Sequence, residues 1–335
     1  DLISTATEIA KKSRTPSRNI GQLLAEAEAK ITEISSRSTN KSYTHIKPIL
    51  ATSFEQLEQN SQTDSEVTGL ATGFVDLDKI TSGLQASDLI ILAARPSMGK
   101  TALALNMAKF AAVKAGVKGA VLIFSMEMSK EQIGVRMLSA EAKVDSNRLR
   151  TGNLEASDWD KLAMATDALS GTEIYVNDTA ALSPYELVTV CKQLHKESPH
   201  GLAFVVVDYL QLMRSSRPNV PREQEIAEIS RSLKGLAKDL GIPVLALSQL
   251  NRSLESRGDK RPQLSDLRES GAIEQDADII LFIYRDEVYN EDSAEKGIAE
   301  LIISKHRNGA TGTVKLAFQG KYTLFGNIST KERYE

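Results

Sequence analysis

Residues 94–101 combine glycine, lysine and threonine at a spacing that suits phosphate chemistry. They read Ala-Arg-Pro-Ser-Met-Gly-Lys-Thr, with an apolar run at residues 88–95 and an apolar-periodic helical segment at residues 102–112. This strand-loop-helix context matches the phosphate-binding loop, except that Ala94 replaces the first glycine. A turn that merely contains Gly-Lys-Thr is the alternative, and Ala94 is tolerable only if its position does not require a positive φ.

The residues at the end of this loop could each bind a phosphate group or a metal ion. Backbone N–H groups around Ser97 and Gly99, with the N-terminus of the following helix, can hold the β-phosphate of a nucleotide. Lys100 can neutralise the β- and γ-oxygens, and the Thr101 hydroxyl can ligate magnesium. The sequence therefore predicts a site for ATP and Mg²⁺.

A magnesium-nucleotide site needs a carboxylate at the end of a neighbouring strand. Residues 204–207 are four β-favouring apolar residues, and Asp208 ends the run. We expect Asp208 to organise the metal together with Thr101. An acid that only terminates a strand is the alternative.

Two further polar residues end strand-like runs. Glu127 follows residues 120–126, and Ser129 with Gln132 predicts a capping box for the next helix, which leaves Glu127 outside that helix. There Glu127 could orient and deprotonate water, although a solvated acid near a helix N-terminus is an equal alternative. Gln249 ends another run and could bond the γ-phosphate, or be a simple strand-terminal residue.

The segment after Gln249 is basic and poor in apolar residues. Residues 251–270 contain five cations: Arg252, Arg257, Lys260, Arg261 and Arg268. Such a loop could grip DNA phosphates, although solvation is the usual explanation of a charged loop. Farther along, Lys305 and Arg307 end a strand-like run, where an arginine could reach a nucleotide across a subunit boundary.

Strand-like runs that position these residues alternate with helical segments. The runs are residues 88–95, 120–126, 173–177, 202–209, 243–249 and 278–284. Several are apolar on both faces, so we predict an α/β fold with a largely parallel, doubly wound sheet. Two more runs, residues 299–306 and 312–318, are joined by five residues and predict an antiparallel hairpin at the sheet edge.

The first 68 residues have a different pattern. Residues 19–36 carry a narrow apolar helical stripe that needs a partner surface, either in its own domain or on another subunit. Polar linker-like residues 36–46 follow, then a short helix around Ile49 and Leu57 and a second polar stretch, residues 59–68. We therefore separate a helical linker region, residues 19–68, from a main domain, residues 69–330.

Composition excludes some classes of protein and leaves others open. The 335-residue chain has 41 basic and 44 acidic residues, a net charge of −3, so nucleic-acid binding would need a local patch. Its single cysteine, Cys191, excludes an intrachain disulfide framework and a zinc ribbon and fits a reducing cytoplasm. No apolar run approaches the length of a membrane span.

Together these segments resemble the DnaB-type replicative DNA helicases, which are RecA-like hexameric motors. The resemblance extends across nearly the whole chain. The shared strings include Thr72-Gly73-Phe74, Ala94 to Thr101, Ser125-Met126-Glu127-Met128, Val207 to Met213, Ser248 to Arg252, Asp266 to Gly271 and Lys305 to Gly309.

The resemblance implies a set of roles around the nucleotide. It implies that Lys100 and Thr101 bind phosphate and magnesium, that Asp208 organises the metal, and that Glu127 activates water. Gln249 would sense the γ-phosphate. Two further roles concern cations: Arg136 resembles a γ-phosphate contact, and Lys305 with Arg307 resembles a finger inserted into the neighbouring subunit's site.

The resemblance also implies partners. Arg268, Glu269 and Gly271 resemble a loop that follows the single-stranded DNA backbone through the channel of a homohexamer, with 5′-to-3′ travel. The helix at residues 19–36 resembles a linker helix that docks on the adjacent subunit. Residues 1–18 resemble the remnant of a preceding domain that helps bind primase, and residues 331–335 would be a tail. A helicase loader is a further implied partner.

Three other classes of function stay open on sequence alone. A RecA-like recombinase would form filaments. A small-molecule kinase would pass phosphate to a bound acceptor. A regulatory ring ATPase would bind protein partners and never touch DNA.

Overall fold

The computed structural model describes residues 2–14, 21, 23–30, 44–62, 67–113, 118–214 and 221–328. The chain divides into two compact units, Asp1–Asp64 and Ser65–Glu335. The predicted tail, residues 331–335, and most of the polar stretch at residues 36–46 lie outside the described residues.

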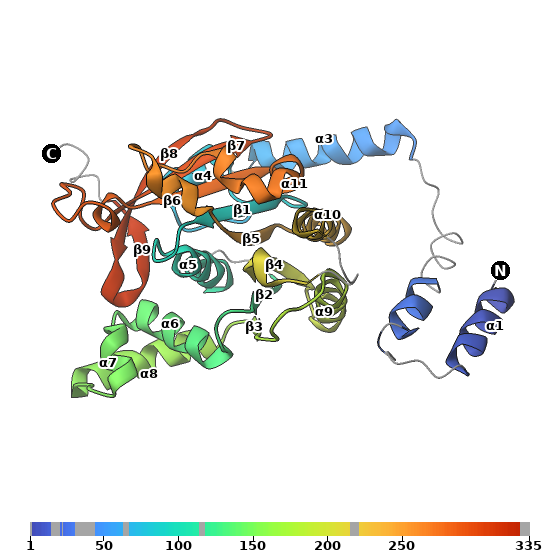
Figure 1. Ribbon diagram of the computed structural model, residues 1–335, viewed down its shortest axis with the longest axis horizontal. Coiled ribbons are helices and arrows are strands. Elements are labelled where there is room, and N and C mark those ends of the chain that lie inside the picture. The colour runs from blue at the N-terminus through green and yellow to red at the C-terminus, as the bar shows by residue number, and fades with distance from the viewer. Residues whose placement is uncertain are drawn as a thin grey trace. The chain divides into compact units, whose positions relative to one another are not determined.

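A single nine-stranded sheet forms the centre of the larger unit (Figure 1). Its strands are β1 (Leu89–Ala94), β2 (Ala120–Ser125), β3 (Ile174–Asn177), β4 (Leu202–Asp208), β5 (Val244–Gln249), β6 (Ile279–Tyr284), β7 (Ile298–His306), β8 (Gly312–Gln319) and β9 (Leu324–Asn327). Their order is β3-β2-β4-β5-β1-β6-β7-β8-β9, parallel through β6 and antiparallel beyond it. The structure confirms the predicted strands and the β7–β8 hairpin, but the edge strand is β9, which the sequence did not predict.

Helices cover both faces of this sheet, as the apolar runs predicted. The helices of this unit are α4 (Val75–Thr81), α5 (Lys100–Val113), α6 (Lys130–Ala142), α7 (Ser146–Thr151), α8 (Ala156–Ser170), α9 (Pro184–Glu197), α10 (Arg222–Leu240) and α11 (Gly271–Asp276). Figure 1 shows α5 on one side of the sheet and α9 and α10 on the other. Alternate residues of β1 enter the two cores, Ile90 beside α5 and Ile91 beside α10, so every β1 residue is buried.

The parallel register brings the carboxyl ends of the central strands to one edge. Ala94 pairs with Gln249 between β1 and β5, and Ser125 pairs with Asp208 between β2 and β4. This edge, which we call the carboxyl edge, is the usual position of ligand sites in open α/β sheets. The antiparallel β7 runs the other way, so its last residue, His306, pairs with Ile279 at the start of β6, on the opposite amino edge.

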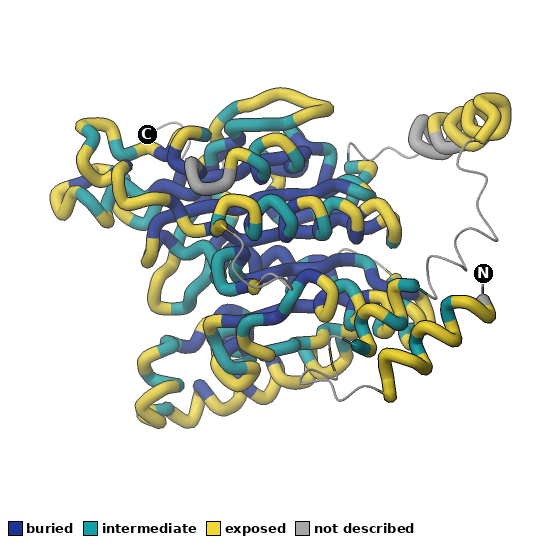
Figure 2. Tube along the Cα trace, turned by 45° about the vertical axis from the view of Figure 1, so that its right-hand side comes forward, coloured by how far each residue is buried: buried dark blue, intermediate teal, exposed yellow. Residues whose placement is uncertain are grey.

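The smaller unit contains helices with different amounts of cover. In α1 (Leu2–Ser13), Lys12 pairs with Glu26 at 2.8 Å and Glu8 pairs with Lys30 at 2.5 Å, so the helix at residues 23–30 has a partner in its own unit. The predicted short helix is the 17-residue α3 (Ile46–Gln62). Five large apolar side chains of α3 are exposed, and the helix is drawn in the exposed colour in Figure 2 wherever it is described: Ile46, Ile49, Leu50, Phe54 and Leu57.

The described helices of both units are too short or too polar to traverse a lipid bilayer.

Candidate nucleotide site

The loop between β1 and α5 has the backbone shape of a phosphate cradle. Ser97 and Gly99 have positive φ angles of 67° and 97°, and α5 begins at the next residue, Lys100. Two features require glycine at position 99: its positive φ, and the Phe325 ring, which would lie 2.9 Å from a Cβ. Ala94 lies in the buried strand β1, so its side chain is compatible with the loop.

Lys100, Thr101 and Asp208 meet at the mouth of this loop. The Thr101 hydroxyl donates to Asp208 Oδ2 at 2.6 Å, and Lys100 Nζ lies 3.7 Å from Asp208 Oδ1. The same ammonium group is 4.2 Å from the centre of the Tyr209 ring, a cation–π contact. Burial lowers the pKa of Lys100, while the charges of Asp208 and Glu127 oppose that shift. The cation is thus held in a poorly hydrated position, where its attraction for a phosphate is strong.

The donor atoms beside Lys100 fit a magnesium ion. Asp208 is buried, and its Oδ1 atom has no hydrogen-bond partner. Within the described residues no group of three or more His, Cys, Asp or Glu side chains could hold a metal. One carboxylate with one hydroxyl is the set that Mg²⁺ uses when nucleotide phosphates and water complete its octahedron.

A pocket of about 420 Å³ opens over this loop. It is lined by Ala94, Arg95, Pro96, Ser97, Gly99, Lys100, Thr101, Ala102, Glu127, Arg136, Gln249, Phe318 and Thr323. The pocket therefore brings together the predicted water-activating acid, the predicted γ-phosphate contacts and the phosphate loop. Its volume lies in the range of small-molecule sites.

Local hydrogen bonds place Glu127 at this pocket. The Ser125 hydroxyl donates to Met128 O at 2.8 Å and so closes a tight turn after β2. Ser129 and Gln132 form the predicted capping box of α6. Glu127 is thus exposed between the strand and the helix, with its carboxylate outside both.

Gln249 is held in place by a residue that the sequence patterns did not single out for this role. The Gln211 side chain accepts from Gln249 N at 3.2 Å and donates to Gln249 O at 3.2 Å. It also donates to the Ser248 hydroxyl at 2.9 Å. The Gln249 backbone is fixed by this clamp, while its side chain is exposed.

The far side of the pocket comes from a segment that the sequence patterns did not reveal. Phe318, at the end of β8, and Thr323, just before β9, line the pocket 217 or more residues after the phosphate loop. Arg285 lies over the Phe318 ring at 4.0 Å and donates to Ser97 O at 3.0 Å, so it ties the two walls together. Only the fold brings these residues together; no local motif marks them.

Three of the five cations after β5 have side-chain partners within the protein. Arg257 donates to both Asp266 oxygens, at 3.2 and 2.8 Å, and Arg261 makes a two-bond pair with Glu300 at 2.8 and 2.7 Å. Lys260 lies 4.7 Å from an aromatic ring centre, that of Tyr289. Two carboxylates and a ring therefore share these three charges, and the hypothesis that they grip DNA phosphates stays a prediction.

Arg95 joins the phosphate loop to the segment after β5. This buried arginine donates to Leu250 O at 2.7 Å and pairs with Glu255 at 2.7 Å. The contact lies in η2 (Arg252–Ser256), which directly follows the Gln249 position. Nucleotide-dependent movement of the loop would therefore reach this segment directly.

The remaining predicted DNA residues lie at a junction between helices. Arg268 and Glu269 belong to η3 (Leu264–Ser270), and Gly271 begins α11. The orientation of the Arg268 and Glu269 side chains lies outside what the structure describes.

Lys305 and Arg307 lie away from the pocket. They end β7 at the amino edge, whereas the phosphate loop begins at the carboxyl end of β1. Five strand residues at about 3.3 Å each separate the two edges by roughly 15–20 Å. Neither residue lines the pocket of its own chain.

The fold and the site define the class of this protein. Contrary to the prediction, the acid does not end a strand next to β1: Asp208 ends β4, and β5 lies between β4 and β1. A phosphate loop after a central strand of a parallel sheet, with an acid at the same edge two strands away, is the arrangement of a P-loop nucleoside triphosphatase of the RecA-like type. Residues 69–327 match the family model of the DnaB-like helicase C-terminal domain.

Comparisons with relatives agree with this match. The chain is 50% identical over 331 residues to the replicative DNA helicase DnaB of Geobacillus stearothermophilus, covering 98% of this chain and 72% of that protein. It is 47% identical to the replicative DNA helicase DnaC of Bacillus subtilis, with the same coverage.

Solved structures give the same result. One solved ATPase domain superposes with a TM-score of 0.81 at 40% identity, over 86% of this chain and all of that one. A DnaB-like replicative helicase, solved in a study of its interactions with primase, gives 0.84 at 37% identity, over 98% of this chain and 75% of that one. The chain belongs to the DnaB-like replicative DNA helicases, and it is an ATP-hydrolysing enzyme of that family.

Proposed function

We propose that this chain is the motor of a homohexameric ring that hydrolyses ATP to travel 5′ to 3′ along single-stranded DNA and unwind the replication fork. The observation that carries the proposal is the split between the two edges of the sheet. The carboxyl edge holds the pocket with Lys100, and the amino edge holds Arg307. A finger at the amino edge can serve only the nucleotide of another copy.

The proposed reaction divides between two neighbouring subunits. In one subunit Lys100, Thr101 and Asp208 bind the phosphates of ATP, and Mg²⁺ supplies charge neutralisation there. Glu127 orients the attacking water and accepts its proton, and Arg136 contacts the γ-phosphate.

Two other groups respond to the γ-phosphate. Gln249 binds it and carries its loss to the segment after β5. Arg307 and Lys305 of the adjacent subunit stabilise charge on the transferring phosphoryl group.

The DNA contact is assigned to the junction of η3 and α11. Arg268 binds the backbone phosphates, and Gly271 allows a close approach of the chain to the strand. Arg261 and Arg257 hold the shape of the preceding loop through their internal ion pairs. Fewer cations of this segment are therefore available to bind DNA phosphates than its composition suggests.

Ring formation needs a surface between subunits, and two helices of the smaller unit have exposed apolar side chains that could supply it. The helix at residues 23–30 pairs with α1, yet its Leu24 is 57% exposed, and the apolar face of α3 is exposed as well. We therefore assign docking on a neighbouring motor domain to the helix at residues 19–36 and add α3 as a second docking surface. Primase and a helicase loader are further proposed partners, and the proposed site of action is the cytoplasm.

Mixed rings test this proposal. Lys100→Ala removes the phosphate cation, and Arg307→Ala removes the finger, so each pure ring should lose ATP turnover. Rings mixed from both variants contain interfaces that pair an intact Lys100 with an intact Arg307, and these should recover turnover. Turnover by either pure variant, or no recovery on mixing, would contradict an active site shared between subunits.

A forked substrate tests the direction of travel. Unwinding should need a single-stranded 5′ tail, ATP and Mg²⁺, and chelation of the metal should stop it. Unwinding that depends on the 3′ tail instead would reverse the proposed polarity.

A further inference from the structure

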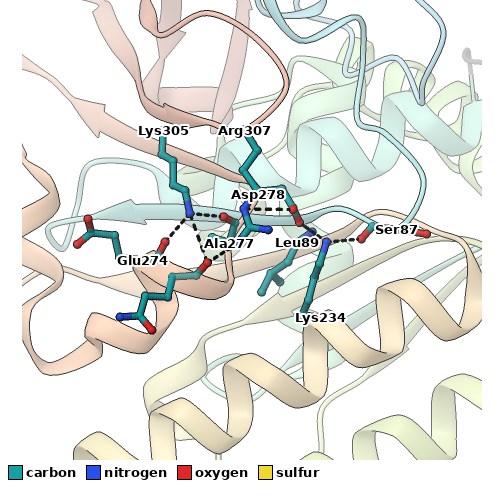
Figure 3. Close-up of polar contacts among 9 residues, drawn as sticks. Ser87, Leu89, Lys234, Glu274, Ala277, Asp278, Lys305 and Arg307 are labelled. Atoms are coloured by element: carbon teal, nitrogen blue, oxygen red, sulfur yellow. Dashed lines mark hydrogen bonds and ion pairs between the residues drawn. The ribbon is translucent and has the colours of Figure 1, made fainter.

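The C-terminal end of α11 rests on the two cations that end β7 (Figure 3). Lys305 Nζ donates to Glu274 O at 2.5 Å and to Ala277 O at 2.6 Å, and Arg307 donates to Gln275 O. The last carbonyls of a helix have no partner within the helix and form the negative end of its dipole. Lys305 and Arg307 therefore cap α11.

Both cations are also tied to the sheet, Lys305 through its pairing with Ile280 of β6 and Arg307 through Asp278. Arg307 N donates to Asp278 O at 2.9 Å, and Arg307 Nε lies 3.8 Å from Asp278 Oδ1. The other carboxylate oxygen accepts from Leu89 N at 2.8 Å and from Lys234 Nζ at 2.5 Å. Figure 3 shows Asp278 between Arg307 and Lys234. The backbone of Arg307 is thus bonded to the residue before β6, while the Lys305 ammonium and the Arg307 guanidinium bond to carbonyls of α11.

The other end of α11 continues directly from the segment assigned to DNA. η3 ends at Ser270 and α11 begins at Gly271. Six helical residues span about 9 Å, so a displacement at one end reaches the other within a single rigid piece. Ile273 anchors the helix in the core, and the Gln275 side chain is exposed.

We propose that α11 couples DNA binding to the finger: when DNA moves η3, α11 shifts its terminal carbonyls and thereby repositions the heads of Lys305 and Arg307. While the α11 carbonyls accept their hydrogen bonds, the Lys305 ammonium and the Arg307 guanidinium stay on their own subunit. When α11 moves away, both cations are free to contact the phosphoryl group bound by the neighbouring subunit. The coupling rests on the proposed function, because it needs both a DNA contact at η3 and a finger that acts in trans. Gln275 and its neighbours in α11 are positioning residues, because their backbone carbonyls hold Lys305 and Arg307.

Two substitutions at Gln275 test the coupling. The bond to Arg307 uses the Gln275 carbonyl, so Gln275→Ala keeps it and keeps the helix stiff, while Gln275→Gly softens the helix at the same exposed position. Glycine disfavours the helical state about fivefold relative to alanine. The DNA stimulation of ATP turnover, measured on the assembled full chain with saturating oligo-dT, should therefore fall by up to about fivefold in the glycine variant relative to the alanine variant. Affinity for oligo-dT should be the same in both.

Equal stimulation in the two variants would overturn the coupling, and so would a loss confined to oligo-dT affinity. The mixed rings of Lys100→Ala and Arg307→Ala, run beside them, separate this outcome from a failure of the proposed function. If those rings recover turnover and the two Gln275 variants are equal, the trans finger stands and only α11 coupling is refuted. If those rings do not recover, the shared site itself is refuted.

Discussion

Replacing Arg261 with alanine should destabilise the motor domain and leave its grip on DNA unchanged. Arg261 is one of five cations in a loop that could grip DNA phosphates, although composition alone favours solvation. In the structure its guanidinium makes two hydrogen bonds to Glu300, at 2.8 and 2.7 Å, and lies 4.8 Å from the Tyr284 ring centre. These contacts raise the pKa of Arg261 above its usual value, mainly through the bonds to Glu300.

The solvent exposure of Arg261 and Glu300 determines how much stability the Arg261→Ala substitution should remove. The Glu300 side chain is 9% exposed, so loss of its cation leaves a carboxylate buried without a counter-charge, which costs about 3–5 kcal/mol for a fully buried pair. The Arg261 side chain is 46% exposed, and water screens part of the attraction. We therefore expect a loss of about 1–3 kcal/mol in the free energy of unfolding for Arg261→Ala.

Two measurements on the same variant check this reasoning. Denaturant unfolding gives the stability, and the salt dependence of oligo-dT binding reports phosphate contacts, each worth about 0.7 in the logarithmic slope for single strands. Arg261→Ala should lower stability and keep the slope, whereas Arg268→Ala should lower the slope. Adding Glu300→Gln to Arg261→Ala should recover part of the stability, because no unpaired charge stays buried. Unchanged stability with a reduced salt slope would show that Arg261 binds DNA and that the assignment of this ion pair is wrong.

Three other perturbations give distinct outcomes. Gly99→Ala should weaken ATP binding at least about tenfold, because the new Cβ would meet the Phe325 ring at a φ of 97°, whereas Gly134→Ala, with no atom near its Cβ, should bind ATP normally. Burial and a neighbouring carboxylate raise the pKa of Asp88 to about 6, so the folded state binds this proton more tightly than the unfolded state. Protonated Asp88 therefore stabilises the folded state below about pH 4, and this contribution is lost as the pH rises through 6. Measured by denaturant unfolding, Asp88→Asn should remove about 1–3 kcal/mol of this pH dependence of stability. Burial raises the pKa of Cys191 to about 12, so its thiol should react with a disulfide reagent only as fast as the protein unfolds; rapid labelling of the native protein would contradict this.

Local sequence patterns were sufficient for the first eight strands of the sheet and for the side of the pocket that follows β1, β2 and β5. Short apolar runs without alternation are typical of strands that are covered on both faces. Each predicted run is a strand whose ends differ from the prediction by one or two residues at most. The phosphate loop, Asp208, Glu127 and Gln249 all follow strands directly, and carboxyl ends of parallel strands meet at one edge. Their proximity therefore follows from strand direction alone.

Tertiary contacts decided what sequence patterns could not. β9 reads Leu-Phe-Gly-Asn, so only two apolar residues precede a glycine and no strand-like run is visible. The pocket residues Phe318 and Thr323 reach the site only because β8 and β9 complete the sheet. The internal partners of the cations after β5 could not be predicted for a related reason. Glu300, the partner of Arg261, is 39 residues away, and charge composition does not reveal which cations have buried partners.

On the proposed function, the position of Arg307 leaves a single copy of this motor domain with an incomplete site. Arg307 is fixed to the amino edge through its own backbone bond to Asp278, so no side-chain rotation brings it to the pocket at the carboxyl edge, roughly 15–20 Å away. The proposed trans finger then requires that the amino edge of one subunit face the carboxyl edge of the next. Because such a head-to-tail contact is heterologous, repeated copies would close into a ring or continue as a helix. On this proposal ATP turnover is a property of the interface, and any change that alters subunit contact should change catalysis even where no residue of the pocket is touched.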